Sequence, residues 1–220
     1  MARLLVVGCV LAACACGPVM TGCSSADIAI KEKFGYAKRE QLVSRVQEAR
    51  DGQQEAKQQF ESALAEFLAV TGVQTGDLEA KYNALKKEQD RSESRAKAVN
   101  DRITNVERVG EALFKEWKGE LSQYSSESLR RASEQQLRDT RAQYDKLIGV
   151  MKAAAGKMQP VLAAFKDQVL FLKHNLNARA IASLQSNADQ LQGDIAALVR
   201  DMEGSIAEAN RFIQQMQAAK

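Results

Sequence analysis

The chain has 220 residues, of which 27% are charged and 5% are aromatic. Lys and Arg total 31 against 28 Asp and Glu, and this near balance argues against nucleic-acid binding, which needs a strongly basic surface. So few aromatic side chains argue against a broad globular core and favour long helices with narrow apolar seams.

Residues 1–22 have the pattern of a signal peptide. Arg3 is the one charged residue before position 27, residues 4–16 are almost wholly apolar, and Gly17-Pro18 interrupts the run. A basic start and a short apolar region are typical of secretory signals, whereas a membrane anchor needs about 20 uninterrupted apolar residues. We predict cleavage after residue 22, with an uncleaved anchor as the alternative.

Cys23 ends the sequence Met-Thr-Gly-Cys, which predicts a lipoprotein cleavage and acylation site. Leu-Ala-Ala-Cys at residues 11–14 is a rival site, with Cys14 as the acylated residue. Cleavage before Cys23 completes the apolar region and leaves Ser24 and Ser25 as a tether, so we favour Cys23. The four cysteines of the chain all precede Ser24, so the mature protein retains only acylated Cys23 and has no disulfide or cysteine-ligated metal.

Acylation of Cys23 also predicts the location of the protein. A lipoprotein cysteine carries three acyl chains such as palmitate, and each buried CH₂ contributes about 0.8 kcal/mol, so the attachment would be permanent. Ser24 and Ser25 follow Cys23, in place of the Asp that retains lipoproteins in the inner membrane. We expect the protein in the cell envelope, on the periplasmic face of the outer membrane, with the membrane as a partner through the N-terminal lipid.

The remainder of the chain has a helical composition. Residues 23–37 form the lipidated cysteine, the tether and the start of the first helix, and residues 38–220 form the main domain. That domain contains one proline and is rich in Ala, Gln, Glu, Lys, Arg and Leu. Apolar residues recur there at alternating intervals of four and three, the heptad spacing of coiled-coil packing. The predicted seams run through residues 42–70, 78–117, 137–172 and 184–213.

Three predicted turns separate these seams. Residues 72–76 begin and end with Gly, and Asp77 is placed to start the next helix. Residues 124–128 contain three serines that suit a helix N-cap, and Asn175 and Asn177 suit the end of one helix and the start of another. Four long helices joined by short turns predict an all-α, elongated, antiparallel up-down bundle.

A bend at a proline is the alternative to the third turn. In that alternative the helix bends at Pro160 and continues through residue 175. In the favoured bundle, Cys23, residues 124–128 and the C-terminus lie at the membrane-facing end, and residues 72–76 and 175–177 lie at the far end.

Three segments resemble a family of uncharacterised bacterial lipoproteins, grouped as a domain of unknown function. They are KREQLVSRVQEARDGQQEAKQQFESAL (38–64), EALFKEWKGELSQYSSESLRRASEQQLRDTRAQYDKLI (111–148) and QPVLAAFKDQVLFLKHNLNARAIASLQ (159–185). The resemblance covers nearly all of the mature chain, and the third segment is its most specific part. It implies that the acylated cysteine stands where Cys23 does before Lys38-Arg39, and it implies no activity.

Few residues suggest chemistry. His174 is the only histidine, and zinc needs three or four ligands, so we expect no metal site and interpret His174 as a donor to a helix C-terminal carbonyl. Ser125, Ser126 and Ser128 lie beside Glu127 without a nearby histidine, so we interpret them as capping residues. We expect no catalysis and no cofactor.

The densest apolar run, residues 169–172, lies at the predicted far end. Four consecutive apolar residues face all sides of a helix, so the run predicts a converging core, with an exposed docking surface as the alternative. The candidate partner-binding residues of that surface are Phe171, His174, Asn175, Asn177 and Arg179.

We therefore predict a non-catalytic envelope lipoprotein, a scaffold or adaptor that binds an envelope protein or itself. The alternative is a lipid- or hydrophobe-binding bundle that opens at polar seam positions. Those positions are Gln53, Gln89, Ser92 and Thr140, which we otherwise interpret as selecting the register of helix pairing.

Overall fold

The computed structural model describes residues 38–72, 77–175 and 177–218, with the side chains of Ala178 and Arg179 excepted. The predicted signal peptide, Cys23 and the tether lie outside the described residues, as do four residues of the predicted turn at 72–76. The elements of the described part are α2 (Lys38–Thr71), α3 (Leu78–Glu120), the 3₁₀ turn η1 (Leu121–Gln123), α4 (Glu127–Gly156), α5 (Met158–His174), α6 (Ala178–Ser186) and α7 (Ala188–Ala218).

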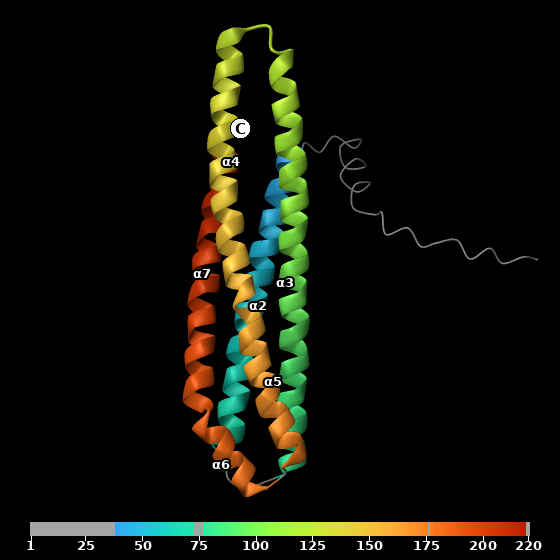
Figure 1. Cartoon of the computed structure of the whole chain (residues 1–220), viewed down its shortest axis with the longest axis vertical. Coiled ribbons are helices and arrows are strands. Elements are labelled where there is room, and N and C mark those ends of the chain that lie inside the picture. The colour runs from blue at the N-terminus through green and yellow to red at the C-terminus, as the bar shows by residue number, and fades with distance from the viewer. Residues whose placement is uncertain (1–37, 73–76, 176, 219–220) are drawn as a thin grey trace, which may run out of the picture.

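The helices form an elongated antiparallel bundle (Figure 1). α2 packs against α3 and α7, α3 packs against α4 and α5, and α4 packs against α7, which closes a ring of four rods. α4 and α5 follow one another along the third rod, and α6 crosses the lower end of the bundle before α7 runs back. No strand occurs in the described residues. The predicted all-α, up-down bundle is confirmed.

Side-chain caps confirm the helix starts that we predicted after the first two turns. The Asp77 carboxylate accepts hydrogen bonds from the backbone N–H groups of Glu79 and Ala80, at 2.9 and 3.1 Å. The Ser126 hydroxyl accepts from the N–H of Leu129 at 3.4 Å and caps α4. Each side chain pairs N–H groups that the first helical turn leaves without a backbone partner.

The third predicted turn is also present. α5 ends at His174, and the Asn177 side chain caps α6 by accepting from the N–H of Ala180 at 3.1 Å. Pro160 lies in the first turn of α5, where backbone N–H groups have no partner within the helix, so the missing N–H of proline costs no helical hydrogen bond. α5 therefore ends at His174 and a new helix begins after Asn177, so the alternative of one bent helix continuing through residue 175 is wrong.

Two helix interruptions were not among the predicted turns. Lys157 separates α4 from α5 within the third rod and lies three residues before Pro160. Its backbone N–H donates to the carbonyls of Ala154 and Ala155. Asn187 separates α6 from α7, and its side chain donates to Gln168 of α5 at 3.2 Å. Heptad spacing carries no sign of this contact, because Gln168 belongs to another helix.

The predicted seams form the core. All nine predicted positions of the first seam, from Leu42 to Val70, are buried. The seams loosen at their ends, where Leu113 and Leu137 are only partly buried. In α7 the predicted Ile206 is partly exposed, and Ser205 is buried in its place. None of the described helices is both long enough and apolar enough to cross a membrane.

Candidate functional site

The far end of the bundle, defined here as the end that holds the turn between α5 and α6, divides the apolar run at 169–172 into two pairs. Val169 and Leu172 are buried in the core, whereas Leu170 and Phe171 are 43% and 40% exposed. The run therefore supplies both a converging core and an exposed apolar pair. Phe171, a predicted partner-binding residue, lies on the surface.

The other predicted residues of the far end belong to the turn itself. His174 is exposed as the last residue of α5. The Asn175 side chain donates to the Phe171 carbonyl at 2.9 Å, which is the contact to a helix C-terminal carbonyl that we predicted for His174. Asn177 caps α6 as described above. The side chain of Arg179 lies outside the described residues.

The opposite end, called here the hairpin end, is formed by α3, η1 and α4. Lys38 forms an ion pair with Glu116, and Arg39 donates to the carbonyl of Met216 at 3.0 Å. The start of α2 and the end of α7 thus lie level with Glu116. Figure 1 shows the α3–α4 hairpin continuing beyond both of them.

The projecting part of the hairpin is held by side-chain contacts. The Trp117 indole N–H donates to the Ser133 hydroxyl at 2.8 Å, and the Tyr124 hydroxyl lies 3.4 Å from the same oxygen. These contacts join α4 to the end of α3 and to the turn after η1. Tyr124 is nevertheless 41% exposed, and Leu129 is 59% exposed, the highest value among the large exposed apolar residues described.

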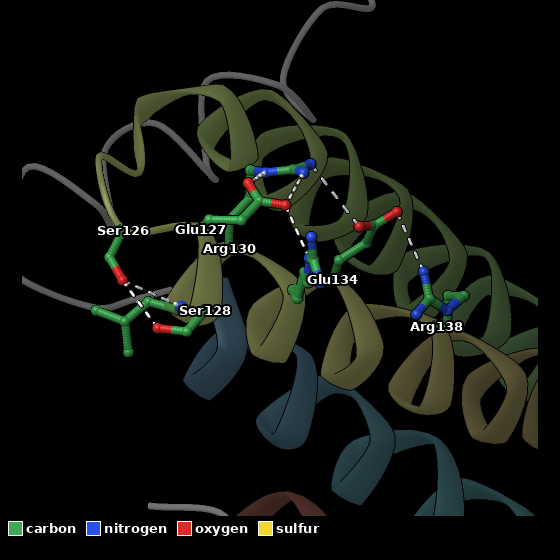
Figure 2. A network of polar contacts seen from close by, with 8 residues as sticks. Ser126, Glu127, Ser128, Arg130, Glu134 and Arg138 are labelled. Atoms are coloured by element: carbon green, nitrogen blue, oxygen red, sulfur yellow. Dashed lines mark hydrogen bonds and ion pairs between the residues drawn. The ribbon is translucent and has the colours of Figure 1, made fainter.

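A polar network surrounds the start of α4 (Figure 2). Glu127 accepts from Arg130 at 2.8 and 2.9 Å and from Arg131 at 2.8 Å. Hydrogen bonds from Arg130, and to a smaller extent from Arg131, lower the pKa of the Glu127 carboxyl. Glu134 continues the network to Arg138 at 3.1 Å. These two glutamates and three arginines leave one positive charge in excess on an exposed surface.

Of the three serines that we interpreted as capping residues, Ser126 caps a helix. The Ser126 hydroxyl caps α4 and lies 3.0 Å from the Ser128 hydroxyl (Figure 2). His174 lies at the other end of the bundle, because α4 and α5 separate it from Ser126. The described arrangement therefore brings no histidine to these hydroxyls. In the described residues no group of three His, Cys, Asp or Glu could hold a metal ion.

An open, mainly apolar groove lies between α3 and α4 below the hairpin end. Its volume is about 430 Å³, and Phe114, Leu137 and Ala142 contribute its apolar wall. The Arg141 guanidinium lies 5.0 Å from the Phe114 ring centroid and 5.5 Å from that of Tyr144. Burial raises the pKa of the Tyr144 hydroxyl, which stays neutral and donates to a carbonyl of α3 at 3.4 Å.

Three of the four predicted polar seam residues, Gln53, Gln89 and Ser92, form hydrogen bonds. Gln53 is fully buried, donates to the Met151 carbonyl at 3.5 Å and accepts from the Ser205 hydroxyl at 2.8 Å. Ser92 donates to the carbonyl of Glu88 at 2.8 Å. Sequence reasoning missed Ser205, because its partner is 152 positions away along the chain.

A buried carboxylate was also missed. Glu208 of α7 is 8% exposed and binds Lys146 of α4 at 3.0 Å and Arg211 of its own helix. Burial acts to raise the pKa of Glu208, but hydrogen bonds from Arg211 and Lys146 outweigh it, so the pKa is lowered. Spacing along α7 places Glu208 and Arg211 on one face, but only the fold brings in Lys146.

A family model described as "Protein of unknown function (DUF2959)" matches residues 28–216. A search of curated proteins and a search of solved structures each gave no match. The family match begins ten residues before the first described residue, Lys38, and ends in the last turns of α7.

Proposed function

The chain belongs to the DUF2959 family, and from that premise we propose that it is a non-catalytic cell-envelope lipoprotein, a helical scaffold or adaptor tethered through Cys23. The observation that carries the proposal is the closed, elongated bundle with its two ends far apart. α2 alone has 34 residues, and at 1.5 Å per residue it separates its ends by about 50 Å. Such a bundle holds an anchor and a binding surface at a fixed distance.

The location follows from the anchor. The tether after Cys23 leads to Lys38 at the hairpin end, so this end would face the membrane, and the far end would project away from it. Ser24 and Ser25 after the acylated cysteine favour the periplasmic face of the outer membrane.

Acylation is tested by replacing each rival cysteine. We expect Cys23→Ala to abolish incorporation of an alkyne-tagged palmitate and to release the protein from the membrane fraction, because the lipid attaches there. Cys14→Ala is the matched control and should behave as wild type. Loss of labelling in Cys14→Ala with retention in Cys23→Ala would show that Cys14 is the acylated residue. Absence of labelling in both the wild type and the control would refute the assignment as a lipoprotein.

The far end supplies the candidate partner surface. Phe171 and Leu170 are exposed there on the last turns of α5, and Asn175 and Asn177 hold the adjacent turn. An exposed apolar pair at the end of the bundle suits a protein partner that covers it. The partner would be an envelope protein or a second copy of this chain.

Photocrosslinking in intact cells tests the far end. A crosslinkable residue at Phe171 should trap a discrete protein, whereas one at Lys97, which is exposed midway along α3, should not. Products at Phe171 that contain only this chain would favour a self-assembling structural role. Identical products from both positions would contradict a docking surface at the far end.

The groove at Phe114 and Leu137 favours a second candidate function, the binding of a lipid or another hydrophobe. Its wall is mainly apolar, and Lys118, Arg138 and Arg141 line it against the single carboxylate of Asp145, which suits an acyl chain with an anionic group. Native mass spectrometry of the purified protein should then show a bound lipid that Leu137→Gln loses. A spectrum with no mass beyond the covalent acyl chains would exclude this candidate.

A further inference from the structure

The large exposed apolar residues of the described chain lie at the two ends of the bundle. Leu68, Leu170 and Phe171 belong to the far end, and Tyr124 and Leu129 belong to the hairpin end. The helices between them expose charged pairs such as Lys97 with Asp101. The surface is therefore solvated along the bundle and apolar at both extremities, so each extremity needs its own explanation.

The hairpin end extends farther along the bundle axis than the first described residue. Lys38 lies level with Glu116, and Trp117 is joined to Ser133, so Lys38 is also about level with Glu134. Seven residues of α4 separate Glu134 from Glu127, which is about 10 Å of helix rise. The exposed Leu129 lies within this projecting part.

The chain outside the structure starts from the same end. If Cys23 carries the lipid, fourteen residues, 24–37, connect it to Lys38. Fully extended they span about 48 Å at roughly 3.4 Å per residue, which exceeds the projection of the hairpin. The tether therefore allows the hairpin end to reach the bilayer that holds Cys23.

The chemistry of the hairpin end matches the boundary between lipid headgroups and acyl chains. Leu129 offers an apolar side chain and Tyr124 an aromatic ring with a hydroxyl, a residue type enriched at membrane interfaces. The adjacent network of Glu127, Glu134 and three arginines has one excess positive charge, and arginine donors suit lipid phosphates.

We propose that the α3–α4 hairpin end, through Leu129 and Tyr124, inserts into the surface of the bilayer to which Cys23 is attached. This inference rests on the proposed function, because a hairpin with one exposed leucine binds membranes weakly unless an anchor keeps it close. With two points of attachment the bundle stands on the membrane. The exposed pair at Leu170 and Phe171 is then directed away from the surface.

The absence of other cysteines in the mature sequence provides a clean test. Leu129→Cys would carry the only free thiol of the acylated protein, and a spin label on it reports contact with lipid. Leu170→Cys is the matched control, since Leu170 is similarly apolar and 43% exposed at the far end. Each labelled, acylated protein is reconstituted in vesicles of phosphatidylethanolamine and phosphatidylglycerol. The reference is the same labelled protein without acyl chains, in dilute solution without detergent.

We expect the label at position 129 to lose accessibility to a water-soluble nickel chelate and gain accessibility to oxygen on reconstitution, with the label at 170 unchanged. Equal nickel accessibility at both positions in vesicles would overturn the proposal. Dipolar broadening between labels at 129 would show a second copy there instead. If the label at position 129 is protected from the nickel chelate without vesicles, another part of the chain covers it. Dipolar broadening and protection without vesicles would each contradict bilayer insertion.

Leu129→Glu supplies a second measurement that does not depend on the label. Leu129 is exposed, so the variant should fold with the thermal midpoint of wild type. Energy transfer from a dye at Leu170→Cys to acceptors in the bilayer should then rise, because the bundle loses its upright orientation. Unchanged transfer would count against the proposal. Flotation with vesicles reports the anchor separately. A protein that floats while its label at position 129 stays in water refutes the insertion alone. A protein that carries no acyl groups refutes both the insertion and the proposed lipid anchor.

Discussion

Gly110 of α3 is the point at which a ring from α4 packs directly on a helix backbone. A Cβ added at Gly110 would overlap the ring of Tyr144. That ring cannot move aside freely, because it makes an edge contact with Phe114 at 5.1 Å between centroids and lies beneath Arg141. The absence of a side chain at this one position sets the approach of the two helices.

We expect Gly110→Ala to lower the free energy of unfolding by about 1–3 kcal/mol, the usual cost of overpacking a core. Gly149→Ala in α4 is the matched control: nothing lies within 4 Å of its added Cβ, and the helical preference of Ala over Gly should raise stability by about 0.5–1 kcal/mol. Urea denaturation of both variants measures the two effects. A stabilised Gly110→Ala would mean that the ring relaxes without cost.

Glu208 predicts how stability depends on pH. Its pKa is lowered in the folded protein because hydrogen bonds from Arg211 and Lys146 outweigh the opposing effect of burial. A carboxyl with a lowered folded pKa binds protons more readily when unfolded, so its stabilisation is present above the ordinary pKa of 4.5 and is lost as the pH falls below it.

We expect Glu208→Gln to be less stable than wild type at pH 7 by about 1–2 kcal/mol, because hydrogen bonds to charged partners are lost. The difference should shrink as the pH falls from about 5 to about 3, because the wild-type carboxyl becomes protonated below its ordinary pKa. Glu61→Gln, at an exposed position of α2, is the control. Thermal unfolding across this pH range measures both, and a difference that stays constant would contradict the assignment.

At the scale of elements, heptad spacing predicted the helices and their buried faces, because the same alternation of four and three positions recurs wherever one face packs in a bundle. Capping residues, which are a local signal, predicted the start of α3 after Asp77 and of α6 after Asn177. The break at Asn187 was not predictable in this way, since its partner Gln168 belongs to another helix.

The candidate surfaces were predictable only in part. The apolar run at residues 169–172 was visible in the sequence, and the predicted seam ended at Leu172, which is buried. The exposure of Leu170 and Phe171 depends on the angle at which α5 lies in the bundle. The projection of the hairpin depends on how far the helices are shifted along one another. A heptad pattern repeats every seven residues and leaves that shift undetermined, so Leu129 gave no signal as a surface residue.

At the scale of the whole molecule, a buried polar layer fixes the shift between helices. Gln53 of α2 meets Ser205 of α7 and the Met151 carbonyl of α4, which joins three of the four rods. Sliding α7 by one heptad would place Leu198 or Phe212 near Gln53 in place of Ser205. The buried amide oxygen would then lack its donor, at a cost of about 1–3 kcal/mol, so the layer selects the observed arrangement over its neighbours.

A double-mutant cycle tests this selection. Ser205→Ala leaves the Gln53 oxygen without its hydroxyl donor and should lower the free energy of unfolding by about 1–3 kcal/mol. Adding Gln53→Leu should recover most of that loss, because replacing both partners with apolar groups removes the unpaired atom. The recovered stability should come with lost uniqueness, seen as extra backbone amide resonances or mixed oligomers, since leucine no longer distinguishes one heptad shift from the next. Strictly additive effects of the two substitutions in urea denaturation would show that Gln53 and Ser205 do not act as a pair, and the layer would then not be what aligns the far end with the hairpin end.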